Sequence, residues 1–269
     1  LEPTEGDPSE QRSSWTSTFM SRDWSVGAEI FKKNAESSVL RCMVHSRDIV
    51  LKTRRSTGIK GMIEGMTRSG RSHRQWQGSD WLRSIGVSSP NCIAIARGTR
   101  DGVAVETLVT EHVPGHTLLW QIARGLIHED PESPASRAVA YAVGRDIAQI
   151  IKSGRFNRDH KPSNLGGTHA APPIAKITTV DAVAILPVKL KDRVNAMARM
   201  IASLLIEPIG IGHPMPPTFM RRVVESLGHE IVDPPNVEPW TRELIAQAER
   251  LVDQHGDPTP EHDPLIGTH

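Results

Sequence analysis

The segment FNRDHKPSNLG, residues 156–166, constrains the fold of this chain more than any other stretch. It is polar and basic, and it lies between an apolar pattern typical of a helix and a β-branched run typical of a strand. The loop carries Asp159, Lys161 and Asn164, and the strand after it ends at Asp181. These spacings allow an acceptor, a cation and an amide carbonyl to face a common point.

Phosphoryl transfer is a chemistry that uses such a set of side chains. It needs a divalent metal between phosphate oxygens, a cation on the phosphates and a carboxylate that orients the attacking hydroxyl. Magnesium takes one or two carboxylates together with phosphate oxygens and water, so Asn164 and Asp181 are enough ligands for the protein to supply. An isolated Asp-x-Lys-Pro sequence is usually a turn. The prediction therefore depends on Lys52, Asp159, Asn164 and Asp181 occurring together in this order.

The first half of the chain predicts strands and one helix. Alternating apolar residues favour an antiparallel hairpin and a second strand pair. The predicted elements are strands 37–45 and 47–53, a helix over 71–85, and strands 91–98 and 103–113 around a turn at 99–102. Gly78 lies inside the predicted helix, where glycine is unfavourable.

The second half predicts four amphipathic helices separated by proline-rich joins. They cover residues 136–154, 192–205, 218–227 and 239–252. A strand-rich front and a helical back predict an α+β chain with two lobes. The predicted parts are a disordered tail (1–14), a β-rich N-lobe with one helix (15–110), a helical C-lobe with the 156–166 loop (111–255) and a second disordered tail (256–269).

Composition excludes several classes of protein. Lys and Arg number 32 against 31 Asp and Glu, so the formal charge of +1 gives no general attraction to nucleic acid or membrane. Two cysteines, Cys42 and Cys92, exclude a disulfide framework and are typical of a reducing compartment. No apolar run approaches the roughly 18–20 residues that cross a bilayer. We expect a soluble cytoplasmic protein with no transmembrane segment and no nucleic-acid partner.

Four stretches resemble protein-kinase-like enzymes. NRDHKPSNL resembles the catalytic loop H-R-D-x-K-P-x-N, with Asn157 in place of the histidine. VLK, residues 50–52, resembles the strand that carries the phosphate-anchoring lysine, and LVTEHVPGHTL, residues 108–118, resembles the inter-lobe hinge. TVDA, residues 179–182, stands in the place of the metal-binding D-F-G, with Ala182 replacing the phenylalanine.

Within that superfamily the chain is most similar to the bacterial lipopolysaccharide core kinases, which phosphorylate heptose or 3-deoxy-manno-octulosonic acid sugars. HRQWQGSDWLRSIGVSSP, residues 73–90, runs parallel to their helix C, and the segment after Asp181 leads into a basic helix without a long activation loop. The resemblance covers about residues 30–206 and implies a bilobal fold with the site in the cleft.

The resemblance also implies a role for each matching residue. Lys52 would hold the α- and β-phosphates of ATP, Val39 would cap the adenine, and Glu111 and Val113 would offer backbone groups to it. Asp159 would accept the proton of the acceptor hydroxyl, Lys161 would neutralise the γ-phosphoryl group, and Asn164 and Asp181 would hold magnesium. The acceptor would be a sugar, a glycolipid or a protein side chain.

The chain departs from the family pattern at four places. Gln75 stands where a glutamate normally pairs with the lysine, so Lys52 would receive only a neutral acceptor, and Gln75→Glu is expected to raise activity. KNAESSV, residues 33–39, stands at the loop that covers the phosphates and contains no glycine. Gly166 stands where the family usually has an apolar residue beneath the adenine. Asn195 stands where its helix tends to carry an aspartate that braces the catalytic loop. A pseudokinase that binds nucleotide or acts as a scaffold therefore remains an alternative, as does a purely structural module.

Three other features have simpler interpretations. The basic stretch over residues 54–83 is either a solvated face or a grip on an anionic sugar–lipid, which leaves peripheral contact with the inner membrane open. Pro114 and Gly115 break any helix between His112 and His116, so a zinc pair is not expected. His160 fills the variable position of the loop.

Overall fold

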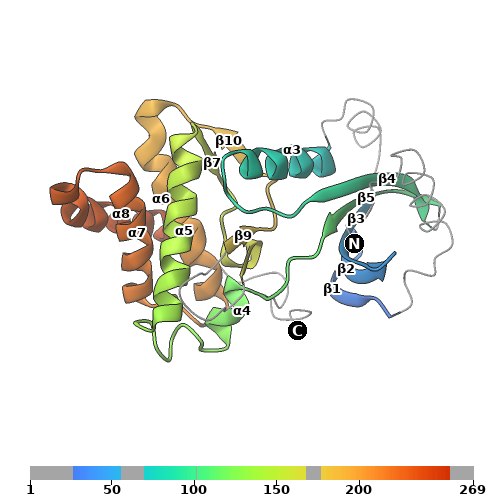
Figure 1. The fold of residues 1–269 in the computed structure, drawn as a ribbon, viewed down its shortest axis with the longest axis horizontal. Coiled ribbons are helices and arrows are strands. Elements are labelled where there is room, and N and C mark those ends of the chain that lie inside the picture. The colour runs from blue at the N-terminus through green and yellow to red at the C-terminus, as the bar shows by residue number, and fades with distance from the viewer. Residues whose placement is uncertain (1–26, 56–69, 101, 168–176, 255–269) are drawn as a thin grey trace, which may run out of the picture. The chain divides into compact units, whose positions relative to one another are not determined.

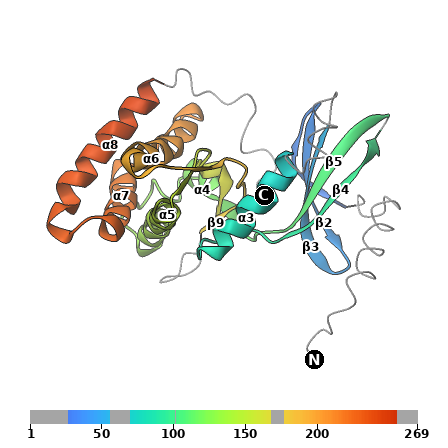
Figure 2. The same cartoon turned by 90° about the horizontal axis from the view of Figure 1, so that it is seen from above.

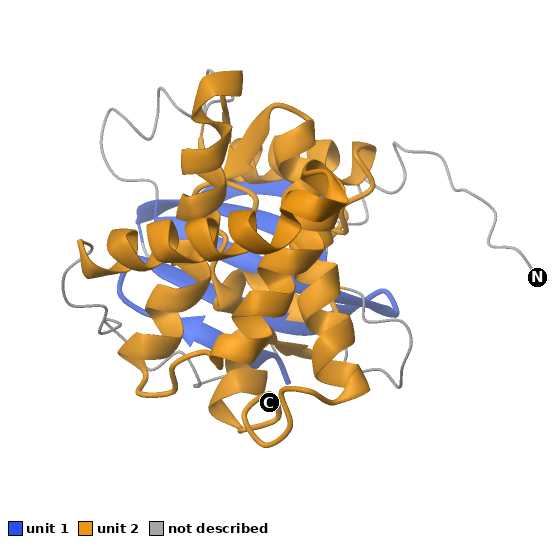
Figure 3. Cartoon of the chain, turned by 90° about the vertical axis from the view of Figure 1, so that its left-hand side faces the viewer, with its two compact units in different colours: residues 1–57, 93–112 blue, residues 58–92, 113–269 orange. Residues whose placement is uncertain are grey.

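The computed structural model describes residues 27–55, 70–100, 102–167 and 177–254 (Figure 1). Both predicted tails, 1–14 and 256–269, lie outside these residues, and so does the middle of the basic stretch. The chain forms two compact units, coloured separately in Figure 3: residues 1–57 with 93–112, and residues 58–92 with 113–269. The described residues 70–91 thus belong to the helical unit, although they precede the last two strands of the sheet.

The first unit is a sheet with the strand order β1-β2-β3-β5-β4. Its strands are β1 (Glu29–Lys33), β2 (Ser37–Val44), β3 (Arg47–Arg55), β4 (Cys92–Arg100) and β5 (Val103–Glu111). The predicted hairpin is confirmed as β2 and β3, which pair antiparallel. His45 and Ser46 join them with positive φ angles of 48° and 61°, as the tight turns that match the twist of a hairpin require.

Alternation along these strands separates two faces. Residues directly opposite each other in a sheet point to the same side. Leu51 lies opposite Leu40 and Val109, and these three belong to the core of the sheet unit. Lys52 lies opposite Val39 and Leu108, so these three share the other face. Two of the predicted nucleotide contacts of the sheet, Val39 and Lys52, are therefore neighbours.

The glycine-free turn between β1 and β2 is closed by a side chain. The Oδ1 atom of Asn34 accepts hydrogen bonds from the backbone N–H of Glu36 at 3.0 Å and of Ser37 at 2.7 Å. The hydroxyl of Ser37 donates to the same oxygen at 3.0 Å. An asparagine that binds its own backbone supports a turn without requiring a glycine conformation.

The second unit holds all of the α-helices among the described residues. They are α3 (Arg71–Ser84), α4 (Leu118–Ala123), α5 (Pro134–Lys152), α6 (Arg193–Gly210), α7 (Pro217–Ile231) and α8 (Val237–Asp253). The four helices predicted in the second half of the chain are present as α5 to α8. Seen from above in Figure 2, α5, α6, α7 and α8 form one group, in which α5 packs on α7 and α6 packs on α8. Gly144 allows the first contact, because a Cβ atom there would lie 2.2 Å from the carbonyl oxygen of Val223.

Two small sheets in the same unit carry the loop of residues 156–166. β7 (Arg155–Asn157) pairs antiparallel with β10 (Ile185–Pro187). β8 (Leu165–Gly167) lies between β6 (His116–Thr117) and β9 (Ile177–Thr179). The segments before and after the loop are therefore each fixed in a sheet.

Among the described helices, none has the length and apolar character needed to cross a membrane.

Candidate active site

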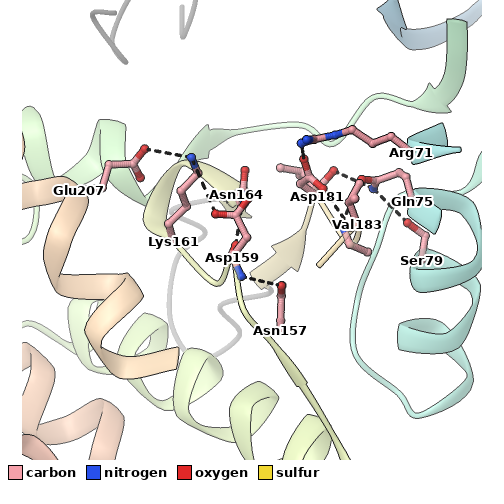
Figure 4. A network of polar contacts seen from close by, with 12 residues as sticks. Arg71, Gln75, Ser79, Asn157, Asp159, Lys161, Asn164, Asp181, Val183 and Glu207 are labelled. Carbon is pink, nitrogen blue, oxygen red and sulfur yellow. Dashed lines mark hydrogen bonds and ion pairs between the residues drawn. The ribbon is translucent and has the colours of Figure 1, made fainter. Parts of the chain in front are cut away.

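The candidate catalytic loop begins at a buried asparagine (Figure 4). Asn157 ends β7 and is fully buried. Its Oδ1 atom accepts a hydrogen bond from the backbone N–H of Asp159 at 3.1 Å. This asparagine, which stands where the family has histidine, therefore fixes the first turn of the loop directly before the candidate catalytic carboxylate.

Asn164 closes the other end of the loop. Its Nδ2 atom donates to the backbone oxygen of Asp159 at 3.0 Å, and its backbone N–H donates to the oxygen of Lys161 at 2.9 Å. Since the side-chain nitrogen is directed to the loop, the carbonyl oxygen Oδ1 is the atom of Asn164 that can ligate a cation.

Asp181 is brought to this loop by β-sheet pairing. β8 and β9 pair with Leu165 opposite Thr179, and the next hydrogen bond runs from the N–H of Val180 to the oxygen of Asn164 at 2.8 Å. Residues 164 and 180 are thus adjacent across the ladder, and Asp181 follows directly. Hydrogen bonds thus connect Asp159 to Asn164, and Asn164 to the residue before Asp181. That the three side chains share one cation stays a prediction.

The carboxylate of Asp181 contacts a backbone amide and an arginine. Its Oδ1 atom accepts from the backbone N–H of Val183 at 3.1 Å, and its Oδ2 atom accepts from a guanidinium nitrogen of Arg71 at 3.2 Å. Arg71 is the first residue of α3, 110 positions earlier in the chain. This ion pair was not predicted from the sequence.

Lys161 lies between two acidic side chains. Its Nζ atom is 3.9 Å from Oδ1 of Asp159 and 3.9 Å from Oε1 of Glu207. Glu207 also binds the loop directly, because its Oε2 atom accepts the backbone N–H of Ser163 at 2.9 Å. The sequence did not predict Glu207. The local feature that marks it is its place directly before Pro208, near the end of α6.

Helix α3 contacts the Asp181 segment through Gln75. This side chain is 2% exposed. Its Oε1 atom accepts the backbone N–H of Ala182 at 3.1 Å, and its Nε2 atom donates to the oxygen of Val180 at 3.2 Å and to Oγ of Ser79 at 3.3 Å. Both amide atoms thus have partners within the helical unit, whereas the sequence predicted Lys52 as the partner.

Gly78 explains how α3 approaches so closely. A Cβ atom at this position would lie 2.1 Å from the carbonyl oxygen of Ala182. The helix runs unbroken through Gly78 because packing against the Ala182 backbone outweighs the low helix propensity of glycine. The small side chain at position 182 belongs to the same contact, since its Cβ would also be 2.9 Å away.

The predicted adenine contacts fall on both units. β5 ends at Glu111, and the N–H of His112 donates to the oxygen of Asp48 at 3.0 Å. Val113 belongs to the helical unit, where it lies beside Gly166. A Cβ atom at Gly166 would be 3.3 Å from Cγ1 of both Val113 and Val180, so these two valines fill the space of the missing side chain.

His160 is fully buried although it follows Asp159 directly. Desolvation lowers the pKa of its imidazole from 6.5 to about 4, so the ring is neutral near pH 7. Neither ring nitrogen has a hydrogen-bond partner among the described residues. A buried neutral ring is suited to packing beneath the loop and not to proton exchange with solvent.

The oxygen donors at this site suit a hard cation. Asn164 can offer Oδ1 and Asp181 its carboxylate, and magnesium prefers such ligands together with phosphate oxygens and water. No cluster of three or more His, Cys, Asp or Glu side chains with metal-site geometry occurs in the described part of the chain. The donor set therefore fits a cation that is shared with a phosphate ligand.

Comparison with known proteins shows a relationship to solved structures. No family model and no curated protein matches the sequence. The solved structure "WaaP in complex with acyl carrier protein" matches with a TM-score of 0.61 and 15% sequence identity, over 94% of this chain and 99% of that chain. The predicted resemblance is thereby confirmed at the level of the fold, since an N-terminal antiparallel sheet and a helical C-terminal region are consistent with a kinase-like fold.

Proposed function

We propose that this chain is an ATP- and magnesium-dependent phosphotransferase of the lipopolysaccharide-kinase type, with a bilobal arrangement of its two units. One observation carries the proposal. The backbone oxygen of Asp159 accepts a hydrogen bond from the amide of Asn164 at 3.0 Å, and the backbone oxygen of Asn164 accepts one from Val180, the residue directly before Asp181, at 2.8 Å. A candidate base and two candidate cation ligands from separate segments are thus held together.

The side chains divide the work of the reaction. Asp159 is 40% exposed, so its carboxylate is accessible to an acceptor hydroxyl, which it orients and whose proton it receives. Lys161 places its ammonium group beside Asp159 and offsets negative charge on the transferred group. Asn164 and Asp181 would hold magnesium, which would supply positive charge against the phosphates of ATP. Lys52 would hold the phosphates and Val39 the adenine.

The acceptor is a hydroxyl of a sugar, a glycolipid or a protein. α6 begins at Arg193, only a short distance after Asp181, and β10 occupies part of the segment between them. Little chain is left there for a peptide-docking loop, which favours a sugar or glycolipid acceptor. The resemblance of the sequence to lipopolysaccharide core kinases supports the same class, and the fold match to WaaP is consistent with it.

A pseudokinase is the second candidate, and one contact favours it. Arg71 already pairs with Oδ2 of Asp181, an oxygen that a metal would need. If this ion pair persists with ATP present, the chain binds nucleotide without turnover.

Two measurements decide between these functions. In the first, thermal unfolding is followed with ATP, with and without MgCl2, since a ligand at 100 times its dissociation constant stabilises by about 2.7 kcal/mol. In the second, hydrolysis of labelled ATP is compared between wild type and two variants. Asp159→Asn is expected to keep the ATP shift and lose about 10²- to 10⁴-fold in rate, because the proton acceptor is removed. Asp181→Asn is expected to lose the magnesium-dependent part of the shift.

Asp192→Asn is the matched control, because Asp192 is exposed and makes no side-chain cap on α6. An ATP shift without hydrolysis in the wild type would favour the pseudokinase. Absence of any shift in both conditions would leave only a structural module.

A further inference from the structure

Gln75 bridges the two peptide groups on either side of Asp181. Its Nε2 atom donates to the carbonyl of Val180, at 3.2 Å, which belongs to the peptide before Asp181. Its Oε1 atom accepts the N–H of Ala182, at 3.1 Å, which belongs to the peptide after it. The side-chain amide thus makes the two backbone hydrogen bonds that a neighbouring β-strand would make. These bonds hold the backbone from which the carboxylate of Asp181 projects.

Only an amide satisfies both peptide groups. A carboxylate at position 75 would place a second oxygen against the oxygen of Val180, and an apolar side chain would leave one buried donor and one buried acceptor unpaired. The hydroxyl of Ser79 accepts from Nε2 at 3.3 Å and so helps to fix which way the amide faces. Reversing the amide would oppose two donors at Ala182 and two acceptors at Val180.

The rest of α3 makes the bridge rigid. Gly78 brings the helix backbone against the oxygen of Ala182, and Arg71 pairs with the carboxylate itself. Arg71, Gln75 and Gly78 are spaced so that they lie on one face of the helix. The segment after α3 adds further bonds, from Ser88 and Ser89 to Thr178 and Thr179 of β9.

We propose that Gln75 is a positioning residue that orients Asp181 toward a divalent cation. The inference rests on the proposed function in one respect, namely that Asp181 is a cation ligand. It gives Gln75 a role in metal binding through Asp181, and it accounts for glutamine at a position where glutamate is expected. Groups that orient metal ligands typically change metal affinity about 10- to 100-fold when they are replaced.

The test uses two substitutions at Gln75 and the same two at Gln77, an exposed residue of the same helix. Gln75→Met keeps the length of the side chain and removes both hydrogen-bonding groups. Gln75→Glu keeps the acceptor for Ala182 and removes the donor to Val180. Hydrogen exchange of the Ala182 amide is measured in the ligand-free protein. The Mn²⁺ concentration for half-saturation is measured with ATP in excess, by electron paramagnetic resonance.

In Gln75→Met, hydrogen exchange of the Ala182 amide is expected to be faster than in the wild type. The Mn²⁺ concentration for half-saturation is expected to rise about 10- to 100-fold. The ATP concentration for half-saturation at excess metal should stay at the wild-type value, because Gln75 acts on the metal ligand alone. Gln75→Glu should weaken Mn²⁺ binding in the same direction. Both Gln77 variants should match the wild type in both measurements.

Wild-type exchange and wild-type Mn²⁺ affinity in Gln75→Met would overturn the inference. Tighter Mn²⁺ binding or faster turnover in Gln75→Glu would also overturn it, and would support the ion pair with Lys52 expected from the sequence. A wild-type protein that binds no Mn²⁺ would remove the proposed function and the metal role of Gln75 together. Faster exchange in Gln75→Met would then show only that Gln75 holds the backbone.

Discussion

Asp146 and His160 are buried titratable residues that respond to pH in opposite directions. Desolvation raises the pKa of the Asp146 carboxyl from 3.8 to about 7, and its Oδ2 atom has no partner among the described residues. The stability that Asp146 contributes is therefore present below pH 3.8 and is lost as pH rises through 7. His160 has a lowered pKa, so its contribution is present above pH 6.5 and is lost as pH falls through 4. Between about pH 4 and 6.5 the two effects nearly cancel.

Asp146→Asn should raise the free energy of unfolding at pH 8 and leave it little changed near pH 3.5. The amide keeps the shape of the side chain but carries no charge, so the buried carboxylate of the wild type is avoided at high pH. One pKa unit corresponds to 1.36 kcal/mol, so the rise from 3.8 to about 7 sets an upper bound of about 4 kcal/mol. Urea unfolding at the two pH values measures the difference.

Asp253→Asn, at an exposed position at the end of α8, is the control and should show no such pH dependence. An Asp146→Asn variant that is equally destabilised at both pH values would mean that the carboxyl has a hydrogen-bonding role that the amide does not reproduce.

At the residue scale, the sequence predicted side chains that lie a few positions apart on one loop, and it missed contacts between residues far apart in the chain. Asp159, Lys161 and Asn164 are separated by a few positions, so their spacing alone placed them on one loop. Gln75 binds residues more than 100 positions away, and Glu207 binds Ser163 across 44 positions. Nothing in the chain near these two side chains marks their partners, because only the packing of α3 and α6 brings them to the site.

At the element scale, α3 depends on a glycine that a helix would normally disfavour. Gly→Ala in the middle of a helix usually stabilises by about 0.5–1 kcal/mol. At Gly78 the added Cβ would lie 2.1 Å from a backbone oxygen, which cannot move without displacing the Asp181 segment. Gly78→Ala should therefore destabilise the protein, by about 1–3 kcal/mol as for other overpacked contacts, and should lower metal affinity.

Gly228→Ala in α7 is a useful comparison for urea unfolding. A Cβ atom there would lie 3.1 Å from Cγ1 of Val237 and 3.2 Å from ring atoms of Trp240, and these side chains can shift by a few tenths of an ångström. We expect a smaller loss than for Gly78→Ala. An increase in stability for Gly78→Ala would show that α3 moves away from Ala182 at little cost.

Length decided which elements the sequence could predict. The long strands β2, β3 and β5 and the helices α5, α6, α7 and α8 follow their hydrophobic periods closely. The strands from β6 to β10 have two or three residues each, and α4 has six, so they are too short to show a period. These short strands are nevertheless the ones that align Asn164 with Val180, because pairing of distant segments supplies what local pattern lacks.

At the scale of the whole molecule, the two units have separate cores of different size. The core of the sheet unit consists of Cys42, Val44, Ile49, Leu51 and Val109, with a few partly buried neighbours. The core of the helical unit draws on α4, α5, α6, α7 and α8 together. A small core supports less stability. Amides of β2 and β3 should therefore exchange through openings of lower free energy than amides of α5.

The difference in amide exchange between the two units gives a test of ATP binding by Lys52 that does not depend on catalysis. If Lys52 and Val39 hold ATP, a ligand concentration of 100 times the dissociation constant should stabilise the sheet unit by about 2.7 kcal/mol, which slows exchange of β2 and β3 amides about 100-fold. Lys52→Met should lose most of this protection, whereas Arg47→Met, at the exposed start of the same strand, should keep it. Equal protection in both variants would show that the sheet binds ATP without Lys52. Protection confined to the helical unit would mean that the nucleotide is held by the loop of residues 156–166 alone.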